Sequence, residues 1–144
     1  MYFDSNGQLI EALLVIGRML GMSRSVAIVF AILYSHDKPC KVEEIASEGN
    51  LSRSAVSLAL RELDQFGAIQ EVAVLGERSR RYCGQPDLSR TVTAMLVNRL
   101  QNPLGELRSK LGDSSGSPVR LEQARSLLNT IDDVLATIHP QGEL

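Results

Sequence analysis

The sequence contains few aromatic residues and no tryptophan; aromatic side chains make up only 4% of its 144 residues. Its apolar content of 44% is ordinary for a globular protein. Leu, Ile, Val and Ala supply most of that apolar mass, which predicts a core built from packed helices rather than aromatic clusters. The length fits one domain, or one domain with an added element for oligomerisation.

Cysteine and long hydrophobic runs are also scarce. Two cysteines are too few for the disulfide framework of a small secreted domain. No basic-then-apolar leader opens the chain, and no apolar run reaches the length that spans a bilayer. We therefore expect a soluble, cytoplasmic protein.

The sequence offers little chemistry for catalysis. His36 and His139 are far apart and no Cys/His set with metal-ligand spacing accompanies them, so we expect no zinc site. No nucleophile–base signature and no glycine-rich phosphate loop is visible. We expect a protein that is not an enzyme and that needs no cofactor or metal.

Positive charge does not dominate the sequence, because the formal net charge is −2 and the pI is about 5.7. This balance excludes a uniformly basic nucleic-acid binder. It leaves room for a local basic patch, since binding depends on where the charges lie.

The stretch from Leu51 to Gly67 has the strongest helix signals in the chain. Ser52 is placed as an N-cap, because its hydroxyl can accept a hydrogen bond from a first-turn amide, and Gly67 can adopt the positive φ that ends a helix. The spacing predicts a buried stripe made by Val56, Ala59, Leu60 and Leu63. The opposite face is predicted to carry Ser54, Ser57, Leu58, Arg61 and Gln65. Such a short, hydroxyl-rich face suits insertion into a DNA groove; a solvated face of an ordinary amphipathic helix is the alternative.

The residues before this stretch complete a helix-turn-helix pattern. A short helix is predicted over Val42–Ser47, with acidic residues in its first turn, and the break Glu48-Gly49-Asn50 leads into the capped helix. Upstream, the pattern predicts apolar helices over Gly7–Leu20 and Ser23–Ser35 and a very short strand near Cys40.

After Gly67 the apolar period changes from 3.6 to 2, which indicates a β-hairpin. Ile69–Val74 reads as one strand, Leu75-Gly76-Glu77 as the turn and Ser79–Cys83 as the returning strand. A hairpin that follows a DNA-reading helix is a wing. Its arginines are Arg78, Arg80 and Arg81. Beside such a helix they are placed for phosphate contacts, although exposed arginines on a hairpin can be merely solvated.

Helices resume after Pro86. Asn102 and Pro103 are predicted to begin a new helix, with Asn102 as its cap, and residues 112–118 form a flexible link. The last helix is predicted to run to about His139. Its heptad seam consists of Leu121, Ala124, Leu128, Ile131, Leu135 and Ile138, widened by Leu127 and Val134. We interpret this face as a subunit interface; a helix folded back on its own domain is the alternative.

These residues resemble the GbsR-type branch of the MarR-like winged-helix transcriptional regulators. The resemblance covers about Gly21 to Pro86. Its motifs are Gly21-Met22-Ser23-Arg24-Ser25, Leu33 with Lys38-Pro39, Glu44-Ile45-Ala46, Ser52-Arg53-Ser54-Ala55-Val56-Ser57, Leu60-Arg61-Glu62-Leu63, Gly67-Ala68-Ile69 and Gly76-Glu77-Arg78. It implies a dimeric, DNA-binding regulator, commonly a repressor, that uses its terminal helices to dimerise. Some members respond to small molecules such as choline, but this sequence offers few aromatic faces for a choline cage.

Together these observations predict a mostly α-helical chain with a small β-hairpin wing. The expected divisions are an N-terminal dimerisation helix (1–20), a winged helix-turn-helix domain (21–86) and C-terminal dimerisation helices with a candidate effector region (87–144). The expected partners are double-stranded DNA and a second copy of the chain; an effector of unknown identity is left open.

Each candidate DNA-binding residue has an expected role. We expect Ser54, Ser57 and Arg61 at base edges and Leu58 against a thymine methyl group. The phosphate contacts are expected from Ser52, Arg53, Arg78, Arg80 and Arg81. A dimer would read two half-sites about 10 base pairs apart, or a multiple of that distance. The alternative function is a winged-helix protein-interaction module in a larger assembly.

Cys40 and Cys83 fall in strands that a winged helix brings together. A disulfide between them would lock the base of the wing, which raises the hypothesis of a redox switch. The alternative is two half-buried, apolar thiols in a reducing compartment.

Overall fold

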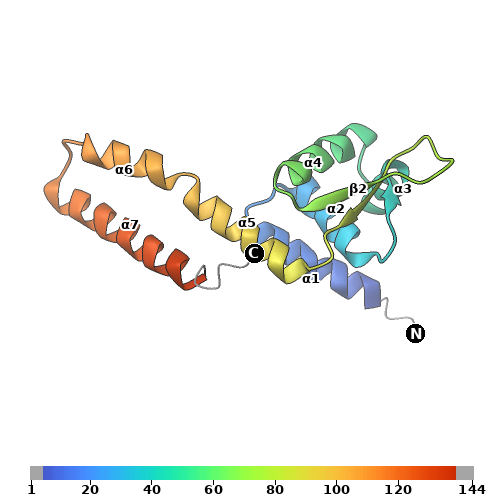
Figure 1. Ribbon diagram of the computed structural model, residues 1–144, viewed down its shortest axis with the longest axis horizontal. Coiled ribbons are helices and arrows are strands. Elements are labelled where there is room, and N and C mark those ends of the chain that lie inside the picture. The colour runs from blue at the N-terminus through green and yellow to red at the C-terminus, as the bar shows by residue number, and fades with distance from the viewer. Residues whose placement is uncertain (1–4, 139–144) are drawn as a thin grey trace. The chain divides into compact units, whose positions relative to one another are not determined.

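The computed structural model describes residues 5–138 (Figure 1). Its elements are α1 (Ser5–Met19), α2 (Arg24–Ser35), β1 (Cys40–Lys41), α3 (Val42–Gly49), α4 (Arg53–Gln65), β2 (Ile69–Val72), β3 (Arg81–Gly84), α5 (Leu88–Gln101), α6 (Leu104–Gly112) and α7 (Pro118–Ile138). The chain divides into two compact units, Met1–Thr91 and Val92–Leu144. The predicted class, mostly helical with a small β-hairpin, is confirmed. Within residues 5–138, no helix combines the length and hydropathy needed to cross a bilayer.

Helix α2 is the central element of the first unit. Ser23 caps it by accepting a hydrogen bond from the Val26 amide at 3.4 Å. Val29 and Phe30 are completely buried, because α1, α3, α4 and β3 all pack against this helix. Such burial on nearly every side explains why α2 has few polar residues.

Helix α1 packs on α2 through one side only. Leu13 is buried, and Gly17 lies so close to α2 that an added Cβ would come within 3.1 Å of the Ala27 Cβ. The many apolar residues of this helix predict burial on more than one side, either between other elements or between subunits. Within the described chain, three large apolar residues of α1 are exposed, namely Leu9, Val15 and Met19.

The helix-turn-helix consists of α3 and α4. The structure corrects the predicted break: Glu48 and Gly49 still belong to α3, and Asn50 takes the left-handed conformation (φ 50°) that reverses the chain. Asparagine tolerates this conformation better than most residues. Ser52 caps α4 as predicted, since its Oγ accepts a hydrogen bond from the Ala55 amide at 3.1 Å.

The sheet has the order β1-β3-β2, with both pairs antiparallel. Its two wing strands are shorter than predicted, because β2 ends at Val72 and β3 begins only at Arg81. Both of these residues lie at the same level of the sheet, where they pair with each other. Residues 73–80 therefore form the wing loop beyond the paired strands (Figure 1).

Tyr34 of α2 closes the base of the wing. Its hydroxyl donates a hydrogen bond to the Ala68 carbonyl at 2.6 Å and accepts one from the Gln85 amide at 3.1 Å. Its ring lies against Gly84, where any Cβ would come within 2.8 Å of the ring. One side chain thus joins the entry and the exit of the hairpin to the central helix.

The second unit is a helical hairpin with a small core. The buried residues of this core are Val97, Leu104, Leu128 and Leu135. Two of the three seam leucines of α7, Leu128 and Leu135, are therefore covered by their own chain, whereas Leu121 is only partly buried. The predicted cap at Asn102 is wrong, because Pro103 occupies the N-cap position of α6 and no side chain caps that helix. His139 lies outside the described residues.

Candidate nucleic-acid interface

The outward side of α4 is the candidate reading face. Leu58 has 62% of its surface exposed, and Ser54, Ser57 and Arg61 are exposed as well. The opposite side is anchored by Val56 and the other predicted stripe residues, all of which are buried. The predicted division of α4 into a core side and a free side is therefore confirmed.

Arg61 is available for an external contact. No hydrogen bond or ion pair joins its guanidinium to any other residue within the described part of the chain. An arginine near the middle of a bare helix face can form two parallel hydrogen bonds with a guanine edge. Glu62 and Asp64 are also exposed on α4, but they flank this face rather than lie at its centre.

Arg53 is engaged at the start of α4. Its Nη2 lies 2.5 Å from Oε1 of Glu43 in α3, with both side chains more than half exposed. The pair connects the two helices of the helix-turn-helix. An exposed pair of this kind contributes little stability, so its guanidinium can exchange this carboxylate for another anion.

The three wing arginines differ in their surroundings. Arg78 is exposed and has no ion-pair partner within residues 5–138. The Nε of Arg80 lies 2.8 Å from Oε1 of Glu71, a pair within the hairpin that is largely exposed. The turn before them is open, with Gly76 at φ 86° and Leu75 fully exposed at the tip.

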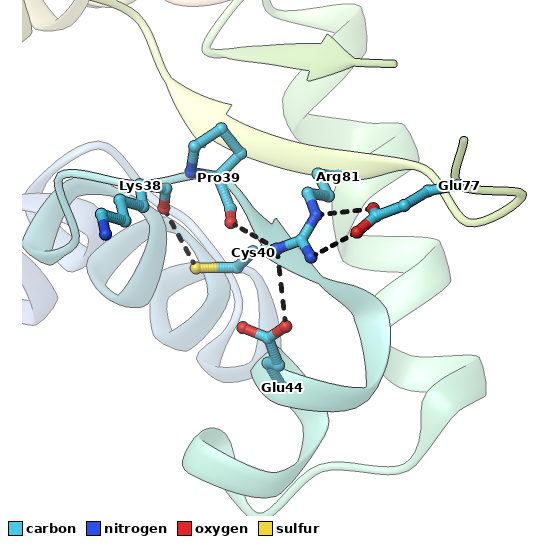
Figure 2. Close-up of polar contacts among 6 residues, drawn as sticks. All are labelled: Lys38, Pro39, Cys40, Glu44, Glu77 and Arg81. Carbon is cyan, nitrogen blue, oxygen red and sulfur yellow. Dashed lines mark hydrogen bonds and ion pairs between the residues drawn. The ribbon is translucent and has the colours of Figure 1, made fainter. Parts of the chain in front are cut away.

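Arg81, predicted as a phosphate contact, is the least exposed of the three wing arginines and is paired within the protein. Only 24% of its side chain is exposed. Its Nε and Nη2 donate to the two carboxylate oxygens of Glu77 at 2.8 and 2.9 Å, and its Nη1 donates to the Pro39 carbonyl at 3.3 Å and lies 3.8 Å from Glu44 (Figure 2). In the free protein the guanidinium is therefore directed at these three acceptor groups.

The partners of Arg81 were not predicted from the sequence. The sequence pattern places Glu77 only in the wing turn, whereas the structure makes Glu77 the main partner of this arginine. The hydrogen bond from Arg81 lowers the pKa of Glu77, and the same bond raises the pKa of Arg81. The four-residue spacing of Glu77 and Arg81 was the available signal, but such spacing predicts a pair only on a helix.

The register of the sheet contradicts the proposed disulfide. Cys40 is paired with Tyr82, whereas Cys83 is paired with Gln70. Since successive side chains of a strand point to opposite faces, the two thiols lie on opposite sides of the sheet. Burial, followed by the charges of nearby acids, raises the pKa of Cys40 to about 11, and burial raises the pKa of Cys83. Both thiols are free and weakly reactive.

No family model and no curated protein matches the sequence. A crystal structure described as that of a transcriptional regulator is similar to this chain with a TM-score of 0.73 at 18% identity, covering 94% of each chain. The chain has a winged-helix fold. A MarR family transcription regulator has a TM-score of 0.46 at 18% identity, covering 94% of this chain and 88% of its own. A mutant of S. aureus MepR bound to an oligodeoxyribonucleotide has 0.48 at 18% identity, covering 90% and 91%. The assignment of the fold rests on the first of these structures.

Proposed function

We propose that this winged-helix protein is a homodimeric, sequence-specific DNA-binding regulator of transcription in the cytoplasm, of the MarR-like, GbsR-type kind, and that it acts as a repressor. One observation carries the proposal. The capped helix α4 buries one side completely and exposes a short face of hydroxyls, a leucine and an unpaired arginine. A rigid helix with small outward side chains is what the major groove admits.

The proposal divides the contacts between bases and phosphates. Arg61 reads a guanine edge, Ser54 and Ser57 donate or accept at neighbouring bases, and Leu58 meets a thymine methyl group. Arg78, which lacks a partner in the described chain, supplies the main phosphate contact of the wing. Ser52, Arg53 and Arg80 add phosphate contacts, the two arginines after leaving their carboxylates.

Dimerisation is proposed through the apolar residues that each unit leaves exposed. On α7, Leu127 and Val134 are 59% and 46% exposed and lie seven residues apart, on one side of the helix. On α1, Val15 and Met19 are 59% and 77% exposed. Because burying such residues is favourable, we expect them to pack against a second copy of the chain. The two α4 helices of the dimer would then read half-sites about 10 base pairs apart or a multiple of that.

A small-molecule effector would act on the spacing of the two reading helices. It has to bind one spacing more tightly than the other to change operator affinity. The described aromatic residues do not form a cage: the ring centroids of Phe30 and Tyr34 lie 4.8 Å apart, but Phe30 is completely buried. Among residues 5–138, no group of aromatic rings therefore supports a quaternary ammonium effector.

A protein-interaction module is the second candidate function. It is favoured by the acidic residues Glu62 and Asp64 on the exposed part of α4 and by the carboxylates that pair with Arg53 and Arg80. These charges reduce the positive field that a DNA-binding surface needs. Binding to duplex DNA with a steep salt dependence would favour the regulator, and its absence would favour the module.

The decisive experiment is fluorescence anisotropy on labelled genomic duplexes, including the region upstream of the protein's own gene. Binding is measured at two salt concentrations and with an excess of unlabelled nonspecific competitor. Tight binding that survives competitor supports a sequence-specific regulator. Failure to bind any duplex at low salt refutes the DNA-binding function and leaves the interaction module.

Arg61→Ala tests the reading face itself. We expect it to weaken operator binding by about 1–3 kcal/mol and to relax specificity at one base position. Arg80→Ala is the matched control, because it removes the same charge from the wing and should weaken all sequences alike. Equal losses on operator and random DNA for Arg61→Ala would contradict a base contact.

A further inference from the structure

We propose that Arg81 is a positioning residue that fixes the wing to the helix-turn-helix, and that it is not itself a DNA contact. This inference rests on the proposed function, because positioning the wing matters for binding only if the wing contacts the DNA phosphate backbone beside α4. It assigns to Arg81 a role different from those of Arg78 and Arg80.

The contacts of Arg81 join three separate segments of the chain. Glu77 belongs to the wing loop, Pro39 to the connection before β1, and Glu44 to α3, the first helix of the helix-turn-helix. Figure 2 shows the guanidinium lying between these three groups. The planar fork of arginine allows this arrangement, because its nitrogens donate in fixed, different directions.

The position of Arg81 in the sheet makes these contacts important for the wing. Arg81 is the first residue of β3, and it is paired with Lys41 on one side and with Val72 on the other. Each of these partners is the last residue of its own strand. Beyond this level the two strands of the hairpin are no longer paired. The contact from Arg81 to Glu77 therefore connects the wing loop, through the other contacts of Arg81, to Pro39 and to Glu44 of α3.

The neighbouring arginine pair does not have this property. Arg80 contacts Glu71, and both residues belong to the hairpin itself. Their side chains are 72% and 44% exposed, against 24% and 29% for Arg81 and Glu77. A pair confined to the hairpin can stiffen it, but it cannot fix the hairpin relative to α3.

Hydrogen exchange on the free, full-length protein tests the proposal without DNA. Arg81→Gln removes all the contacts of the guanidinium, and Arg81→Lys keeps the charge but not the fork. We expect the amides of residues 73–82 to exchange about fivefold faster or more in both variants. Arg80→Gln, the control with the same loss of charge, should leave these amides within about twofold of the unchanged protein.

The amides of α2 serve as the internal reference for folding. If Arg81→Gln also accelerates exchange in α2, the comparison is made with Glu77→Gln, which removes the main partner and leaves Arg81 in place. Faster wing exchange in Glu77→Gln supports the proposal. Wing exchange that is the same in Arg81→Gln, Glu77→Gln and Arg80→Gln overturns it.

The salt dependence of binding to a nonspecific duplex gives a readout that structural damage alone does not change. Arg78→Gln should lower the slope of log affinity against log salt by about 0.9, the value for one lost phosphate contact. Arg81→Gln should weaken binding about threefold to tenfold while its slope stays at that of the unchanged protein. A slope lowered by Arg81→Gln as much as by Arg78→Gln makes Arg81 a phosphate contact and overturns the proposal.

The two arms separate this inference from the proposed function. If the unchanged protein binds no duplex, the proposed function fails, and the hydrogen-exchange arm still decides whether Arg81 positions the wing. If the protein binds DNA but the amides of residues 73–82 exchange at the same rate in Arg81→Gln, Glu77→Gln and Arg80→Gln, the proposed function stands and the positioning role of Arg81 fails.

Discussion

The two units of the chain bury their apolar residues to different extents. In the first unit, Val29, Phe30 and Leu63 are 0% exposed, and several more are below 2%. In the described part of the second unit, the most deeply buried residue is Val97 at 3%, followed by Leu135 at 5%. The first unit thus has a closed core around α2, whereas the second has a narrow core along one side of a helical hairpin.

This difference indicates how the units depend on their surroundings. A unit with a closed core can fold on its own contacts, while a few helices around a narrow core bury too small a share of their surface for much stability. The second unit also leaves Leu107, Leu127 and Val134 more than 40% exposed. We interpret the second unit as one that gains its full stability from a partner, in keeping with the proposed dimer.

The same substitution in the two cores measures the contrast directly and has the largest expected effect. Leu63→Ala should lower the free energy of unfolding by about 3–5 kcal/mol, because α4 packs on rigid neighbours that cannot fill the cavity. Leu135→Ala should cost about 2–3 kcal/mol, because a shallow site can collapse. Urea unfolding followed by circular dichroism, at one protein concentration, gives both values. Equal costs would show that the two cores are equally tight.

Charged substitutions on the exposed side of α7 test whether the second unit uses a partner. Leu127→Glu and Val134→Glu should each weaken self-association at least tenfold, because a carboxylate would be buried against apolar residues. Ser126→Glu is the matched control, since it adds the same charge at an exposed polar position of α7. Sedimentation velocity over a range of concentrations measures the association. Unchanged association in both variants would remove α7 from the dimer interface.

The sequence predicted the first unit better than the second. Caps and apolar spacing are local signals, so Ser23, Ser52 and Gly67 located the ends of α2 and α4 correctly. The apolar seam of α7 was also found, but periodicity identifies a face without saying what covers it. Leu128 and Leu135 of this seam pack within the second unit, while Leu127 and Val134 beside it are exposed, a division that periodicity alone could not give.

The candidate site shows the same limit. Exposure of Ser54 and Arg61 followed from helical geometry and could be predicted. The partners of Arg81 could not be predicted, because they depend on the register of the sheet and on Pro39 and Glu44, which are far away in sequence. One residue of register also decided that Cys40 and Cys83 lie on opposite faces.

The serine caps of the two units give a smaller, matched comparison. The Ser52 Oγ accepts from the Ala55 amide at 3.1 Å, whereas the Ser117 Oγ accepts from the Arg120 amide at 3.5 Å. We expect Ser52→Ala to cost about 1 kcal/mol and Ser117→Ala about 0.5 kcal/mol, since the longer bond is weaker. Urea midpoints of the two variants provide the measurement. A larger cost at Ser117 would mean that the start of α7 is more tightly ordered than its hydrogen bond indicates.

The smallest expected effect is a pH dependence of the wing in the first unit. The hydrogen bond from Arg81, together with the charges of Arg81 and Lys41, lowers the pKa of Glu77 below its ordinary value of 4.5. A carboxyl group with a lowered pKa stabilises the folded state at pH values above the ordinary pKa, and this contribution is lost as the pH falls through the lowered value. Wing amides should therefore keep their protection at pH 4.5 and lose it only at lower pH.

Carbon NMR of the Glu77 carboxyl group follows this titration directly. Arg81→Gln should move the midpoint back towards 4.5, because the donor that stabilises the ionised form is gone. Arg80→Gln should leave the midpoint unchanged, since Arg80 contacts Glu71 instead. If the titration midpoint of Glu77 is the same in the protein without substitutions, in Arg81→Gln and in Arg80→Gln, the two hydrogen bonds from Arg81 to Glu77 seen in Figure 2 are not maintained in solution. The wing would then be fixed by its short sheet alone, and the first unit would have a mobile edge beside a rigid core.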